Sequence, residues 1–74
     1  MATFRTRVVR PSYSRAIQWM VDTHMAHRAG YTREWLVDML STMLSVEVTA
    51  HAFHVRKATV VRDVMALWTK QGAR

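Results

Sequence analysis

The chain has 74 residues, eleven of them Lys or Arg against five acids, which gives a formal net charge of +6. This length fits one domain, and an apolar share of 50% provides for one compact core and argues against disorder. The lack of cysteine excludes disulfides and thiolate metal sites, so the core or a partner subunit must stabilise the fold.

Residues 1–11 are expected to form an extended basic arm ahead of a single helical domain, residues 12–74. Arg5 and Arg7 alternate with other residues in a stretch rich in β-branched side chains, which is typical of an extended segment or an edge strand. Such an arm can lie in the minor groove of DNA, as homeodomain arms do. The simpler interpretation, which we prefer, is a frayed end or an edge strand whose charges prevent aggregation.

A first helix is predicted over residues 13–28, with Ser12 or Ser14 as its N-cap. Gly30 suits the left-handed conformation just past the end of this helix. The positions with helical spacing are Ile17, Met20, Val21 and His24, and His24 is expected at the edge of the core. Trp19 falls off that stripe, so we expect it to be exposed and available for a dimer or partner contact.

A second helix is predicted over residues 33–44, with Thr32 as its N-cap. It carries the most regular apolar stripe of the sequence, which should form the spine of the core: Trp35, Leu36, Met39, Leu40, Met43 and Leu44. Leu40, in the middle of the stripe, is predicted to be fully buried. The methionines at helical spacing are also expected in the core.

Ser45 is expected to cap a short third helix over residues 46–53. After a break near residues 54–56, a fourth helix is predicted over residues 57–70. Its expected buried face consists of Val60, Val61, Val64, Met65, Leu67 and Trp68. The sequence therefore predicts a small all-α, four-helix domain with a helix-turn-helix at residues 46–70.

The segment Val48–Leu67 resembles the helix-turn-helix of bacterial repressors, especially the DeoR-type pattern that ends in Ala-Thr-Val-x-Arg-Asp-Leu. Here the matching run is Ala-Thr-Val-Val-Arg-Asp-Val, residues 58–64. The resemblance implies that Ala50 lies where the two helices approach most closely, that Val55 fills the turn and that Val60 faces the first helix of the pair. The turn position that usually holds glycine, because it adopts a left-handed conformation, is His54 here.

The resemblance also implies that the fourth helix enters the major groove of double-stranded DNA. The outward residues at its start are Arg56, Lys57, Thr59 and Arg62. Arg62 is the best candidate for a bidentate contact with guanine, and the backbone near Ser45 could hold a phosphate. The competing interpretation is that these cations form an ordinary solvated face.

Neither a metal site nor an enzyme is expected. The pairs His24–His27 and His51–His54 have i, i+3 spacing but lack a carboxylate or thiolate neighbour at standard spacing, so no metal or other cofactor is predicted. The sequence has no Gly-rich phosphate loop, nucleophile motif or paired carboxylates. No small-molecule ligand is predicted either.

The strongly basic composition predicts an anionic partner, and the motif favours DNA. We therefore expect a small, sequence-specific transcriptional regulator of phage or mobile-element type that acts as a homodimer. It should be cytoplasmic and without a membrane partner, because no apolar run approaches the ~18 residues of a membrane span. The alternatives are a small protein that binds and inhibits or redirects a host protein such as RNA polymerase, and an RNA-binding protein.

Overall fold

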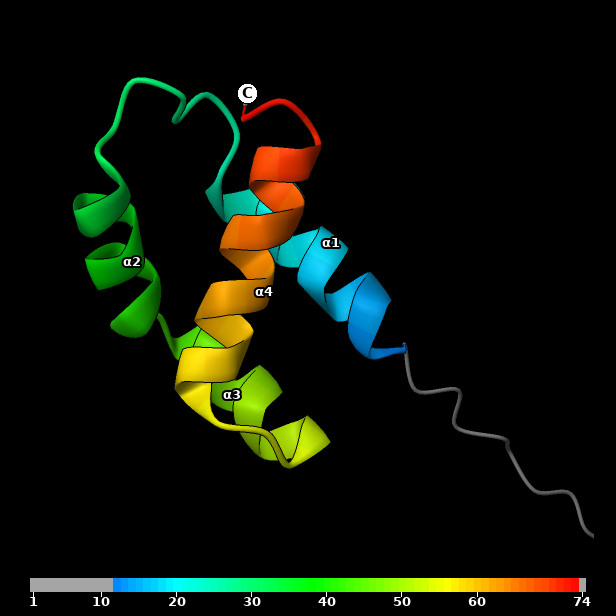
Figure 1. Cartoon of the computed structure of the whole chain (residues 1–74). Helices are drawn as coiled ribbons and strands as arrows, with labels where there is room; N and C mark the ends of the chain where they lie inside the picture. The colour runs from blue at the N-terminus through cyan, green and yellow to red at the C-terminus, as the bar shows by residue number, and fades with distance from the viewer. Residues whose placement is uncertain (1–11, 74) are drawn as a thin grey trace, which may run out of the picture.

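The computed structural model describes residues 12–73, so the predicted basic arm with Arg5 and Arg7 lies outside the described residues. The described part contains four helices and no strand: α1 (Tyr13–His24), α2 (Arg33–Ser41), α3 (Leu44–Phe53) and α4 (Lys57–Lys70). Figure 1 shows a long loop between α1 and α2 and short connections between the other helices. The predicted all-α, four-helix fold is confirmed, and α4 has the predicted bounds. None of the four is long and apolar enough to cross a membrane.

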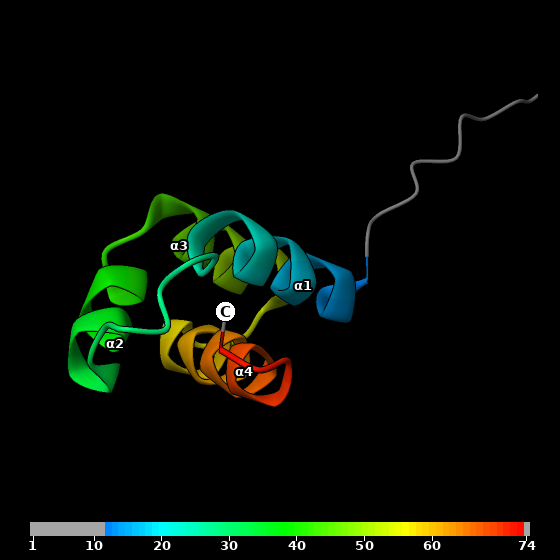
Figure 2. The same ribbon diagram turned by 90° about the horizontal axis from the view of Figure 1, so that it is seen from above.

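The longest helix, α4, lies at the centre of the molecule and packs against each of the other three. Seen from above, α1 and α3 lie together on one side of α4, and α2 lies beside its flank (Figure 2). The buried core draws on all four helices and includes Ile17, Met20, Val21, Met25, Leu36, Leu40, Val46, Ala50, Val60, Val61, Val64, Met65 and Trp68. Because α1, α2 and α3 cover only part of its circumference, one face of α4 remains open to solvent.

Side-chain caps start the first two helices, as predicted. The Ser12 hydroxyl accepts a hydrogen bond from the Arg15 amide at 3.3 Å, and the Thr32 hydroxyl accepts one from the Trp35 amide at 3.1 Å. The predicted end of α1 is wrong, because the helix stops at His24 instead of reaching residue 28. In the connection that follows, the residue with positive φ is His27 (62°) and not Gly30.

The predicted spine of the core is confirmed only in its middle. Leu36 and Leu40 are fully buried, whereas Trp35 is 47% and Leu44 71% exposed. The stripe fails at its far end because α2 stops at Ser41, and the chain leaves the helical conformation before α3 begins. This break resets the helical phase, so Leu44 does not continue the face on which Leu40 lies.

The prediction that Ser45 caps the third helix is wrong. α3 begins at Leu44, its N-cap is Met43, and no side chain caps it. Ser45 lies inside the helix, and its hydroxyl shares a 2.8 Å hydrogen bond with Nε2 of His24 on α1. Burial, and then the nearby Arg28 guanidinium, lower the pKa of His24 below its usual range. His24 is thus half-buried at the edge of the core, as expected, and it connects α1 to α3.

Candidate nucleic-acid interface

The turn between α3 and α4 is closed by a pair of backbone hydrogen bonds. The Val55 amide donates to the Ala50 carbonyl at 3.0 Å and the His54 amide donates to the His51 carbonyl at 3.3 Å, the pattern of a Schellman motif. His54 lies in the left-handed region, with φ 57° and ψ 44°. A histidine therefore holds the conformation that glycine adopts most easily, and the turn forms without one.

Three apolar side chains hold the two helices together around this turn. Ala50 of α3 is buried, Val60 of α4 is fully buried and Val55 packs partly buried against the core. Their burial places the α3–α4 contact in the core. The roles that the repressor resemblance implies for the three positions stay predictions.

The start of α4 is positively charged and lacks a side-chain cap. Arg56 is the N-cap residue without a capping hydrogen bond, Lys57 is the first helical residue, and the first turn contains no acid. By contrast, α2 carries Glu34 and α3 carries Glu47 in the first turn. Since the helix dipole already places partial positive charge at this end, two cations here concentrate positive potential at one point of the surface.

Arg62 points away from the core, because Val60, Val61 and Val64 take the inward positions of α4. Its side chain is 71% exposed. The Nε and Nη2 atoms of Arg62 each lie 3.3 Å from Oδ1 of Asp63, so the guanidinium rests against a carboxylate while remaining open to solvent. Thr59 is half-buried between this face and the core.

Asp63 is itself held in place from α1. The Tyr13 hydroxyl donates a 2.6 Å hydrogen bond to Oδ2 of Asp63. The Tyr13 ring packs edge-on against Phe53 of α3, with centroids 5.4 Å apart. Burial, and then the bond to Asp63, raise the pKa of Tyr13 well above its usual range. Three helices thus position the carboxylate that contacts Arg62.

A groove of about 250 Å³ between α2 and α4 places a second arginine on the same surface. Arg33 and Arg62 both line it, and Val37, Val61 and Met65 are among its apolar lining. Sequence reasoning missed Arg33, because the pairing of α2 with α4 brings together residues far apart in the chain. The described cations on this side of α4 therefore extend beyond the turn and onto α2.

The structure does not bring every predicted DNA-contacting residue to this surface. Arg56, Lys57, Thr59 and Arg62 lie within the first two turns of α4 or just before it. Ser45 lies on α3 and bonds His24 through its hydroxyl, and the phosphate contact predicted for the backbone at the start of this helix stays a prediction. Arg5 and Arg7 are outside the described residues.

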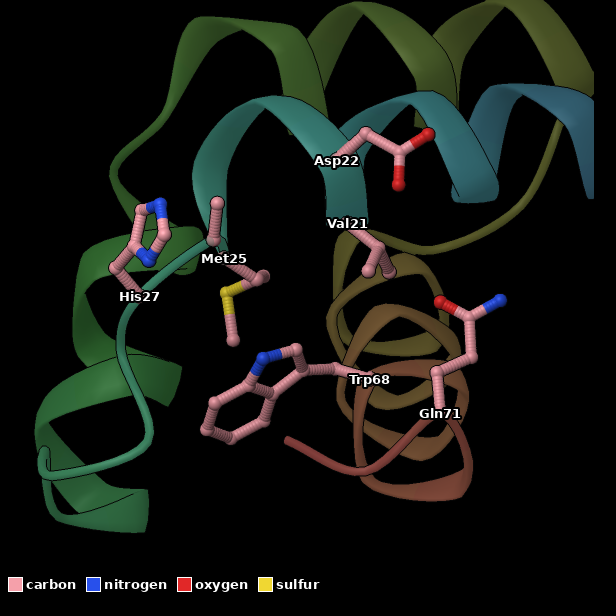
Figure 3. Close-up of a pocket in the computed structure, with 7 residues that line it drawn as sticks. Val21, Asp22, Met25, His27, Trp68 and Gln71 are labelled. Carbon is pink, nitrogen blue, oxygen red and sulfur yellow. The ribbon is translucent and has the colours of Figure 1, made fainter. Parts of the chain in front are cut away.

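A separate pocket of about 220 Å³ lies at the opposite end of α4 (Figure 3). Met25, just after α1, and the Trp68 ring of α4 face each other across it, with Asp22, His27 and Gln71 at its rim. Trp68 follows Lys57 by eleven residues, roughly 16 Å along a helix. The pocket is therefore distinct from the basic surface. The described residues include no group of three or more His, Cys, Asp or Glu side chains arranged to hold a metal ion.

Comparison of the chain with known protein families, with curated proteins and with solved structures gives no match. The geometry and charge of the surface around α4 are therefore the features that bear on function.

Proposed function

We propose that this protein is a small sequence-specific DNA-binding regulator of transcription and that α4 is the helix that enters the major groove. The proposal agrees with the resemblance of Val48–Leu67 to repressor helix-turn-helix segments. A single module of this size binds a specific site weakly, so the proposal includes a homodimer that reads two half-sites.

The observation that carries this proposal is the pair of cations at the start of α4. Acidic side chains are favoured at a helix N-terminus, and cations there oppose the helix dipole. Arg56 and Lys57 are therefore electrostatically unfavourable in the free protein, and no side chain caps the helix. A DNA phosphate would remove both disadvantages, because it neutralises the cations and accepts hydrogen bonds from the first amides of the helix.

Arg62 supports the base-reading part of the proposal. It follows Lys57 by five residues, roughly 7.5 Å further along the helix axis, and points outward. A guanidinium can donate two parallel hydrogen bonds to O6 and N7 of guanine. The contact with Asp63 limits the directions in which the guanidinium can point, which reduces the entropy lost when it meets a base edge.

The proposal is tested by titrating the protein against random double-stranded DNA at about 50 and 200 mM salt. We expect affinity to fall steeply with salt, with a log–log slope of about −0.9 for each phosphate neutralised. Replacing both Arg56 and Lys57 with alanine should make that slope shallower by about 2, since two phosphate contacts are lost. Lys70→Ala, at the far end of α4, is the matched control and should leave the slope unchanged.

Weak, salt-independent association with duplex DNA would contradict the proposal. The adaptor alternative, in which the same face binds a protein, would then become the leading hypothesis. Tighter binding to RNA than to DNA in the same titration would instead favour an RNA-binding protein. Circular dichroism of each variant separates loss of binding from loss of folding.

A further inference from the structure

The outer side of α3 carries the most exposed large hydrophobic residue of the described part of the chain. Leu44 is 71% exposed and Val48, one turn later, is 55% exposed. Together with Glu47, His51 and Ala52 they line one shallow hollow of about 390 Å³. We call these five residues the α3 face. Single exposed apolar residues are ordinary on a protein surface, but two large ones on successive turns, in one hollow, form a patch suited to contact with another molecule.

The charge of the α3 face distinguishes it from the other helices. Residues 44–53 contain no Lys or Arg, whereas each of the other three helices contains at least one. With Glu47 at its centre, this face offers little to a phosphate backbone. It is also the helical surface on which two copies of a chain with net charge +6 can meet without bringing cations together.

The order of residues on the face is self-complementary. Glu47 and His51 are four residues apart, one turn of the helix, and lie on the same side of Val48. If two α3 helices pack antiparallel about a two-fold axis level with residue 49, midway between them, each Glu47 lies opposite His51 of the second copy. A carboxylate accepts a hydrogen bond from an imidazole N–H, so the axis would create the same pair twice. Leu44 of each copy would then cover the C-terminal end of α3 in the other copy, where His51 and Ala52 lie.

We propose that the α3 face is a homodimer interface, in which two copies pack antiparallel through Leu44 and Val48 with reciprocal Glu47–His51 pairs. The inference does not rest on DNA binding. Trp19, which is 55% exposed on neighbouring α1, packs edge-on against His24, the residue bonded to Ser45 at the start of α3. It therefore adds apolar surface at the margin of the same face.

The proposed interface is small, so we expect a low affinity between the two copies. One helix face and a marginal tryptophan bury less than the ~800 Å² per partner of a standard stable interface. The dimer should therefore be weak, with a dissociation constant of about 1–100 µM.

Sedimentation velocity of the full chain, without DNA, tests the proposal over about 1–500 µM protein, which brackets that range. We expect a shift from monomer to dimer for the wild type. Glu47→Arg places an arginine opposite His51, and His51→Glu places two acids opposite each other, so each variant alone should dimerise at least tenfold more weakly. Ala66→Glu, on the exposed side of α4, is the matched control and should dimerise like the wild type.

An equimolar mixture of Glu47→Arg and His51→Glu is the decisive measurement. In a mixed dimer the new arginine faces the new glutamate across the axis, and the remaining Glu47 faces the remaining His51. Dimerisation should therefore recover in the mixture, which damage to the fold of either variant would not allow. A monomeric wild type at all concentrations, single variants that still dimerise, or a mixture without recovery would each overturn the proposal, whatever the protein does with DNA.

Discussion

At the scale of single residues, the contact between Tyr13 and Asp63 links the packing of the helices to Arg62, the residue proposed to contact bases. The two residues are separated by 50 positions in the chain, yet the hydroxyl and the carboxylate lie 2.6 Å apart. Asp63 in turn contacts Arg62, which points to solvent. The orientation of Arg62 therefore depends on how α1 packs against α4.

Tyr13→Phe should lower the free energy of unfolding by about 1–2 kcal/mol at neutral pH, because it removes a hydrogen bond to a carboxylate. The effect should depend on pH in a defined direction. The pKa of Tyr13 is raised in the folded protein, so the unfolded chain loses this proton first, near its ordinary value of about 10. Stability from the hydroxyl is complete below that pH and is lost as pH rises above it.

Urea unfolding of wild type and Tyr13→Phe between pH 7 and pH 11 measures this difference. The stability gap between the two proteins should narrow above about pH 10. A gap that is absent at pH 7 would show that the hydroxyl contributes nothing to the free energy of unfolding. A gap that stays constant through the alkaline range would show that the contribution does not depend on the hydroxyl proton.

Lys57→Glu should separate stability from DNA binding. An acid at the first position of α4 suits the helix dipole, so the variant should be more stable than the wild type by roughly 0.5–1 kcal/mol. Its affinity for DNA should fall at least tenfold at low salt, because a phosphate contact becomes a repulsion.

Lys70→Glu, at the other end of α4, is the mirror-image control. It places an acid where the dipole favours a cation, so it should lower stability and change DNA affinity little. Thermal melting and a DNA titration of both variants complete the comparison. A less stable Lys57→Glu protein would remove the argument that this helix start was shaped for an anion.

At the scale of elements, helix starts could be predicted from the sequence better than helix ends. Ser12 and Thr32 have the short polar side chains that cap helices, and both do so. Ser45 has the same chemistry, but His24 is within reach of its hydroxyl, and a contact with another helix cannot be seen in a local pattern. The end of α1 was missed for a related reason, since His27 adopts the left-handed conformation that Gly30 was expected to provide.

The C-terminal ends of α3 and α4 form a natural pair for testing backbone strain. Both end in the same hydrogen-bond pattern, but the first residue with positive φ is His54 after α3 and Gly72 after α4, with φ 57° and 99°. Ala73, after Gly72, also has positive φ (50°). The left-handed conformation costs a residue with a Cβ about 1–2 kcal/mol of conformational free energy. Glycine avoids this cost, but it loses more backbone entropy on folding than other residues do, which offsets part of the gain. His54→Gly should therefore raise the free energy of unfolding by about 0.5–1 kcal/mol.

Gly72→Ala should have the opposite effect, a loss of about 1 kcal/mol, because it places a Cβ at positive φ. Chemical denaturation of the two variants measures both changes. If His54→Gly is less stable than the wild type, the imidazole makes contacts that outweigh the backbone strain.

At the scale of the whole molecule, the fold class followed from the sequence, but the contacts that form the candidate site did not. Apolar stripes in three segments, together with caps and breaks, predict four helices, because periodicity is a local property. Which helix packs on which is a long-range property. The groove that joins Arg33 to Arg62, and the bond from Tyr13 to Asp63, therefore carry no local signal. The basic start of α4 could be predicted because it lies in one continuous segment.

Two leucines of the predicted apolar stripe, one buried and one exposed, should differ strongly in how much stability is lost when each is replaced by alanine. Leu40→Ala should cost about 2–5 kcal/mol, since the side chain is fully buried and leaves a cavity. Leu44→Ala, four residues later, should change stability by less than about 0.5 kcal/mol in the monomer. Thermal melting at low protein concentration compares them, and similar losses for both would contradict the packing described for α2 and α3.

The central claim is that α4 reads DNA bases through Arg62, and selection of binding sites from a random duplex library tests it most directly. Wild type and Arg62→Ala are selected in parallel, and each is then titrated against the enriched site and against random DNA. The wild type should enrich a defined site, and Arg62→Ala should bind that site more weakly by about 1–3 kcal/mol and lose preference at one base pair. A library without enrichment, or an Arg62→Ala variant that selects and binds the wild-type site unchanged, would contradict the claim.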